Sequence, residues 1–109
     1  MPEPLVALFT TVGSEVDARR LAALLVERRL AACVQVSAIE SVYRWQGAVQ
    51  QDREWRLLAK TPEACRDAAL TAWREAHPYD LPALWWQPVD AEPRYAGWVA
   101  DETAPPRRP

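Results

Sequence analysis

The stretch AACVQVSAIESVYRWQGAVQQDREWRLLAKT, residues 31–61, decides the fold of this chain. It is rich in β-branched and aromatic residues and contains one glycine, Gly47, near its middle. This pattern predicts two long antiparallel strands, 32–45 and 48–60, joined by a tight turn at Gln46–Gly47. The tip half of the hairpin is polar on at least one face. We therefore expect it to project beyond the core of its own domain and to be stabilised by lying across a neighbour.

The segment before the hairpin predicts one strand and one helix. Residues 5–12, LVALFTTV, form a short apolar run that is typical of a buried strand. From Ser14 to Arg29 apolar side chains recur at helical spacing, which indicates an amphipathic helix. Ser14 and Asp17 have the spacing of a capping box at its start, with Asp in place of the usual Glu.

The segment after the hairpin predicts a second helix. Thr61 and Pro62 indicate its start, with Thr61 as the N-cap and Pro62 at the first helical position. Cys65 falls on the apolar stripe of this helix, so its simplest role is that of a small core residue. Pro78 biases the residue before it away from helical dihedral angles, so the helix should end near Ala76.

Residues 81–89 predict a last strand bounded by prolines, and residues 93–101 predict a short last helix. Trp85 and Trp86 are adjacent in this strand and should point to opposite faces of a sheet. One layer of core cannot bury both, so a second covering surface is expected, and another subunit could provide it. Residues 102–109 are expected to form a disordered tail.

The predicted elements follow the order β-α-β, β-α-β and end with a short C-terminal helix. That order predicts the α+β class and the ferredoxin-like, split β-α-β plan, a four-stranded antiparallel sheet with both main helices on one face. The 109-residue chain is expected to form a single domain over residues 1–101. The fold alone does not assign a function, since it occurs in RNA-binding modules, acyl phosphatases, metallochaperones and trimeric regulators.

Composition argues against several of these functions. The net charge is −2 and the sequence pI is about 5.4, so we expect no nucleic-acid partner. No stretch reaches the length of a membrane span and the N-terminal residues do not resemble a signal peptide, so we expect a cytoplasmic protein with no membrane partner. Cys33 and Cys65 form no CxxC motif. Two reduced cysteines are the expected state, with a disulfide between them as the open alternative.

The stretch AHPYDLP, residues 76–82, contains the only histidine of the chain, His77. His77 is a candidate catalytic base or metal ligand. One histidine and two separated cysteines define no Ser/His/acid or Cys/His relay, and we expect no enzymatic activity. Pro78 and Pro82 also give the stretch an architectural role, because they end one helix and open the last strand.

Four segments, in their order and spacing, resemble the CutA family of divalent-cation tolerance proteins. They are AACVQVSAIESVYRWQG (31–47), LLAKT (57–61), AHPYDLPAL (76–84) and YAGWV (95–99). The resemblance runs from Leu5 to Val99. It implies a ferredoxin-like subunit in a tight homotrimer, arranged much like the PII signalling proteins, with hairpins that pair edge to edge between subunits. It also implies a role in the tolerance of, or response to, divalent metal ions.

The resemblance also raises the question of copper. Copper binding is attributed to some members of the family through a thiol on the first strand and neighbouring histidines at the H-P-Y corner. Here Phe9 and Ala76 occupy those positions, which leaves His77 as the metal candidate. One imidazole supplies one ligand, whereas a transition-metal site normally has three or four. We expect weak binding of a divalent ion such as Cu²⁺ and no other cofactor.

The alternative function is a PII-like sensor or scaffold trimer that binds a small ligand in the clefts between subunits. The candidate ligand-binding residues are Cys33, Tyr43, Arg44, Trp45, Lys60, Tyr79 and Asp80. Lys60, the only lysine, could meet an anion as a point charge, and Arg44 could clamp a carboxylate or phosphate. Structural roles stay open for the others: Tyr43 and Trp45 could pack between subunits, and Cys33 could be a buried small residue.

Overall fold

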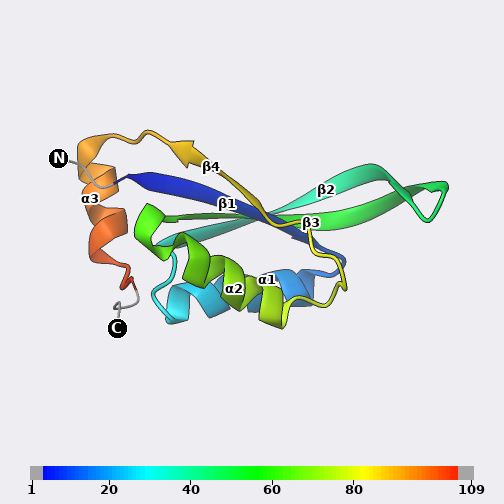
Figure 1. Ribbon diagram of the computed structural model, residues 1–109, viewed down its shortest axis with the longest axis horizontal. Helices are drawn as coiled ribbons and strands as arrows, with labels where there is room; N and C mark the ends of the chain where they lie inside the picture. The colour runs from blue at the N-terminus through cyan, green and yellow to red at the C-terminus, as the bar shows by residue number, and fades with distance from the viewer. Residues whose placement is uncertain (1–3, 106–109) are drawn as a thin grey trace.

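Four strands form one antiparallel sheet in the order β2-β3-β1-β4 in the computed structural model, which describes residues 4–105 (Figure 1). The strands are β1 (Leu5–Val12), β2 (Cys33–Trp45), β3 (Ala48–Pro62) and β4 (Trp85–Val89). The helices are α1 (Glu15–Glu27), a 3₁₀ turn η1 (Glu63–Cys65), α2 (Arg66–Ala76) and α3 (Pro93–Asp101). The predicted α+β class and element order are confirmed. Within residues 4–105 no helix is long and apolar enough to cross a membrane.

The core lies between the sheet and helices α1 and α2, which cover one of its faces (Figure 1). Alternate residues of β1, among them Val6 and Leu8, are fully buried against these helices. Trp73 of α2 is also fully buried, and its indole Nε1 donates a hydrogen bond to the carbonyl of Leu21 in α1, 3.1 Å away. This bond gives the buried N–H a partner and ties the two helices together.

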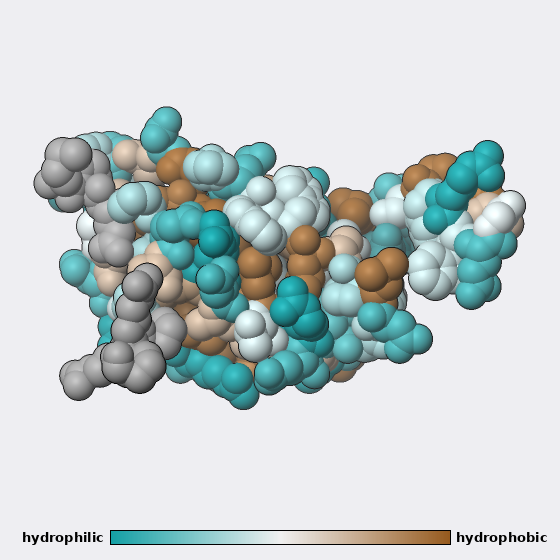
Figure 2. Space-filling model, in the orientation of Figure 1, coloured by the Kyte–Doolittle hydropathy of each residue, from teal (hydrophilic) through white to brown (hydrophobic). Residues whose placement is uncertain are grey.

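Strands β2 and β3 form the long hairpin that the sequence predicts. They pair from Cys33–Lys60 to Trp45–Ala48. Gln46 and Gly47 have φ of 51° and 82°, the left-handed values that a two-residue hairpin turn of type I′ requires and that glycine adopts at little cost. The hairpin tip projects beyond the helices, and Figure 2 shows hydrophobic side chains exposed on it.

The predicted start of the second helix at Thr61 and Pro62 is wrong. Both residues belong to β3, where Thr61 pairs with Val6 and Pro62 is the last residue of the ladder. The hydroxyl of Thr61 donates to the carbonyl of Leu30 at 2.7 Å instead of capping a helix. Pairing with β1 therefore extends the strand through a local helix-start signal, and α2 begins only at Arg66.

The predicted strand over residues 81–89 is too long, because β4 begins at Trp85 and pairs only with Leu5–Phe9 of β1. No strand begins at Pro82. The edge of β1 beyond Phe9 has no partner strand there within residues 4–105, and His77 contacts it at Thr10 and Thr11.

The predicted disordered tail is also corrected over its described part. Thr103 is buried and its hydroxyl donates to the carbonyl of Val99 at 2.9 Å. The N–H of Ala104 donates to the carbonyl of Arg29 at 2.8 Å. Residues 102–104 therefore contact the domain, while residues 106–109 of the predicted tail lie outside the described residues.

The Thr61 hydroxyl should contribute measurably to stability. The Thr61→Val substitution keeps the shape of the side chain but removes the donor to the Leu30 carbonyl. We expect it to lower the free energy of unfolding by about 1–3 kcal/mol, the usual cost of depriving a buried polar group of its partner. Guanidinium denaturation at fixed protein concentration measures this. Thr71→Val, at an exposed position of α2, is the matched control, and equal effects of the two substitutions would contradict this role for Thr61.

Candidate functional site

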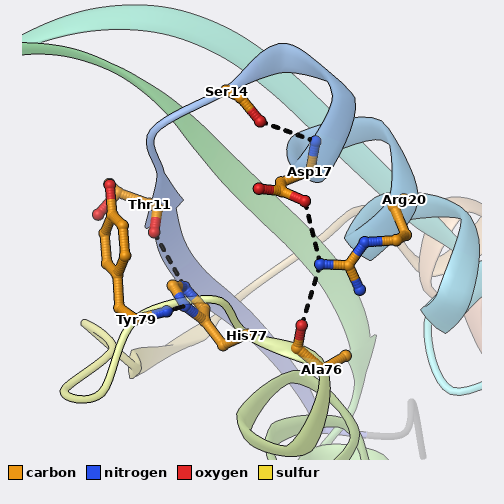
Figure 3. Close-up of polar contacts among 7 residues, drawn as sticks. All are labelled: Thr11, Ser14, Asp17, Arg20, Ala76, His77 and Tyr79. Atoms are coloured by element: carbon orange, nitrogen blue, oxygen red, sulfur yellow. Dashed lines mark hydrogen bonds and ion pairs between the residues drawn. The ribbon is translucent and has the colours of Figure 1, made fainter.

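The corner that follows α2 is held against the end of β1 and the start of α1 (Figure 3). His77 follows the last helical residue with extended dihedral angles, φ −72° and ψ 136°, as expected for a residue before proline. The guanidinium of Arg20 donates to the carbonyl of Ala76 at 3.0 Å and pairs with Asp17 at 3.2 Å. Arg20 thus satisfies a carbonyl that the helix end leaves without an internal partner. The predicted end of the helix at Ala76 is confirmed.

Both ring nitrogens of His77 are engaged inside the subunit. Nδ1 accepts a hydrogen bond from the N–H of Tyr79 at 3.1 Å. Nε2 therefore carries the proton, and it lies 3.0 Å from the carbonyl oxygen of Thr11 and 3.1 Å from Oγ1 of Thr10. Burial lowers the pKa of His77 below its usual 6.5, because the charged ring would be desolvated, and this outweighs the hydrogen bond to Thr11, which acts in the opposite direction. In this arrangement His77 joins the corner to β1.

Tyr79 places its hydroxyl against the buried carboxylate of Glu54 on β3. The hydroxyl donates to Oε2 at 3.0 Å, and Glu54 is only 9% exposed. Burial and the neighbouring Glu54 carboxylate raise the pKa of Tyr79 to about 12, so the hydroxyl stays protonated and remains a donor. Gly13 permits this approach, because a Cβ there would lie 3.0 Å from the Tyr79 hydroxyl oxygen.

The corner and the hairpin together line a concave groove of about 790 Å³. Its aromatic lining residues are Tyr43, Trp45 and Tyr79, and its acidic lining residues are Glu40, Glu54 and Asp80. Among the described residues that line it there is no lysine, arginine or histidine. The pKa of Tyr43 is raised, chiefly because its hydroxyl donates to Asp52 at 2.5 Å. The groove is therefore an aromatic and negatively charged site.

A second groove of about 420 Å³ lies on the sheet face that α1 and α2 leave open. Leu5, Ala7 and Phe9 of β1 line it. Phe9 stacks on Trp85 of β4 with ring centroids 3.9 Å apart, while Trp85 itself remains 48% exposed. Leu5, Ala7 and Phe9 are themselves at most 6% exposed, so the half-exposed Trp85 is the large hydrophobic side chain that this part of the face presents.

The structure divides the predicted ligand-binding residues between two places. Tyr43, Trp45, Tyr79 and Asp80 line the aromatic groove. Cys33 and Lys60 pair across the far end of the hairpin, where Lys60 lines the second groove and its Nζ lies 5.5 Å from the ring centroid of Tyr95. Arg44 sits between Tyr43 and Trp45 in β2, so its side chain points to the other face of the sheet.

Sequence reasoning missed Glu54, Glu40 and Thr11 as lining residues of the aromatic groove. The sequence shows Glu54 only as one of several polar residues on the second hairpin strand. Its pairing with Tyr79, 25 positions away, depends on the corner being fixed to β1, and no local pattern reports that contact. Within residues 4–105 no group of three or more His, Cys, Asp or Glu side chains is arranged to hold a metal ion.

Comparison with known proteins gives consistent matches over nearly the whole chain. Residues 6–102 match the family model described as CutA1 divalent ion tolerance protein. A divalent-cation tolerance protein CutA from Thermus thermophilus is 40% identical over 98 residues, covering 88% of this chain and 95% of the relative. The chloroplastic CutA 1 of Oryza sativa is 36% identical over 102 residues, 92% of this chain, but the match spans only 58% of that relative's length.

Solved structures of CutA proteins are similar to this chain in fold. A crystal structure of CutA1 from Oryza sativa has a TM-score of 0.90 at 34% identity, covering 94% of this chain and 96% of that one. The structure of CutA from Synechococcus elongatus has a TM-score of 0.89 at 37% identity, covering 94% of this chain and 92% of that one.

The lowered pKa of His77 predicts a pH dependence of stability. Because the folded pKa lies below the ordinary 6.5, the stabilisation is fully present above about pH 6.5 and is lost as the pH falls from 6.5 through the folded pKa. In His77→Gln, which keeps a donor but does not titrate, this loss should be absent. Denaturation midpoints of both proteins over this pH range measure the difference, in which the carboxylates common to both cancel. Parallel curves for the two proteins would count against the proposed titration.

Proposed function

Because the chain belongs to the CutA1 divalent ion tolerance family, we propose that it acts in divalent metal ion tolerance as a homotrimer. The observation that carries the assembly is the open sheet face. On this face Trp85 stacks on the buried Phe9 and is itself 48% exposed in a single subunit. Burial of such a surface favours association. A two-stranded hairpin that projects from its domain is only marginally stable by itself. It would be stabilised by packing across another copy of the chain.

The proposal includes the absence of catalysis. The only histidine of the chain uses both ring nitrogens in hydrogen bonds to Tyr79, Thr11 and Thr10, so it is not available to activate a nucleophile. We also propose a cytoplasmic location. The sequence has only two cysteines and no CxxC motif, and we expect both to be reduced, as is usual for proteins of reducing compartments.

We propose that a divalent ion, copper included, binds weakly with His77 as a ligand. Coordination through Nδ1 would replace the hydrogen bond from the Tyr79 N–H, so the ion must compete with a formed contact. One subunit brings no cluster of three or more candidate ligands together within residues 4–105. Further ligands would have to come from neighbouring subunits or from water.

A second candidate function is a ligand-responsive trimer of the PII kind. The observation that favours it is the aromatic groove, which gathers Tyr43, Trp45, Tyr79 and Asp80 beside the buried Glu54. Its volume of about 790 Å³ falls within the range of small-molecule sites.

The trimer can be tested by mass and by substitution on the open face. Light scattering should give about three times the subunit mass of 12.4 kDa. Trp85→Arg places a charge in the hydrophobic face and should reduce the mass toward that of one subunit, whereas Val16→Arg, at a 77% exposed position of α1, should leave it unchanged. Circular dichroism confirms that each variant is folded. A wild-type mass near 12.4 kDa would refute the assembly.

Copper binding can be tested by calorimetric titration of the wild type and His77→Gln at neutral pH. We expect a dissociation constant in the micromolar range or weaker, and about tenfold weaker binding in the variant, the effect of about 1.4 kcal/mol of lost ligand interaction. Binding should also weaken as the pH falls, because a protonated imidazole does not bind a metal ion. Identical heats for both proteins would rule out His77 as a ligand.

A further inference from the structure

The aromatic groove carries uncompensated negative charge. Of its three acids, Glu40 is 3.5 Å from Arg53 in an exposed pair. Within residues 4–105 no basic side chain lies within ion-pair distance of Glu54 or Asp80. The raised pKa values of Tyr43 and Tyr79 follow in part from these and neighbouring carboxylates. The groove therefore favours a cation and disfavours an anion.

Glu54 is the most buried acid of the groove. It is 9% exposed, and the hydrogen bond that it receives from a neighbour is that of the Tyr79 hydroxyl to Oε2. A carboxylate can accept about four hydrogen bonds, so Glu54 keeps capacity for a further donor. Thr11 and Ser41 place two further hydroxyl groups in the same lining. An N–H donor that enters the groove would find several oxygen acceptors.

The aromatic and apolar side chains that line the groove suit an organic molecule better than a bare ion. Tyr43, Trp45 and Tyr79 line it and are 41%, 47% and 39% exposed in a single subunit, so none of the three rings is covered by its own domain. Aromatic faces attract ammonium groups, most strongly where water is excluded. Val42 and Leu81 add apolar surface to the lining. A volume of about 790 Å³ accommodates a molecule of many atoms.

We propose that this groove binds an organic ammonium ion, a primary alkyl- or arylammonium. Its charged group lies at Glu54 with Asp80 nearby, and its apolar part lies against Tyr43, Trp45 and Tyr79. The proposal rests on the second candidate function and names the chemical class of its ligand. It replaces the anionic ligand that Lys60 and Arg44 suggested in the sequence, because neither residue lines this groove.

The test is calorimetric titration of the native oligomer with phenethylammonium chloride. Phenylacetate and 2-phenylethanol are the matched probes, since they keep the aromatic body and change the charge. We expect the ammonium probe to bind at least about tenfold more tightly than either, as one charge-assisted hydrogen bond gives. Glu54→Gln should weaken its binding by about tenfold or more, and Glu75→Gln, on an exposed part of α2, should not change it.

Because Glu54 is buried, a second variant at an exposed position keeps the proposal falsifiable if Glu54→Gln does not fold. Asp80→Asn should weaken binding of the ammonium probe severalfold. The proposal is overturned by equal binding of phenylacetate, by binding that neither variant weakens, or by no binding at about 10 mM probe.

A thermal-shift screen of anionic, neutral and cationic metabolites separates failure of the ligand class from failure of the second candidate function. Stabilisation by anionic or neutral compounds alone, abolished by substitution of Trp45, would overturn the ammonium ligand and retain the ligand-responsive trimer. Stabilisation by primary amines alone supports the proposal. No stabilisation by any compound would overturn both.

Discussion

Strand β1 is buried on both faces over almost its whole length, so its backbone needs hydrogen-bond partners along both edges. Strand β3 supplies them along one edge, from Leu5 to Val12. On the other edge β4 reaches only to Phe9. Beyond that point Nε2 of His77 provides the bond to the carbonyl of Thr11. A side chain thus completes the edge that the last strand leaves unpaired.

This contact has consequences for the groove. It fixes the corner after α2 at the end of β1, and the N–H of Tyr79 then reaches Nδ1 of the same ring. From that position the Tyr79 hydroxyl reaches the buried Glu54. The position of Tyr79 in the aromatic groove therefore depends on the hydrogen bond between His77 and β1. The same geometry explains why His77, the residue that first suggests chemistry, has its ring directed to the backbone.

The two faces of the sheet differ in how fully they are covered within one subunit. Toward α1 and α2 the side chains are closely packed and the polar groups are satisfied, as with the indole of Trp73. On the other face Phe9 is covered by Trp85, which is itself half exposed. Membership of a metal-tolerance family and an acidic, aromatic groove are compatible. The acidic and aromatic lining of the groove suits an organic cation, whereas no group of three or more candidate metal ligands lies together within residues 4–105.

The sequence by itself determined what local patterns encode. The hairpin and its turn at Gln46–Gly47 were predictable because the turn needs positive φ, and the family was identifiable from motifs in order. The start of α2 was not predictable, since Thr61 carries a helix-start signal that pairing with β1 overrides. The sequence predicted four of the groove residues as ligand-binding. That Lys60 lies in another groove, and that Glu54 lies beside the four, depends on the tertiary structure alone. The physical reason is that the strand register and the hydrogen bonds of the corner, which join residues far apart in the chain, fix where each side chain points.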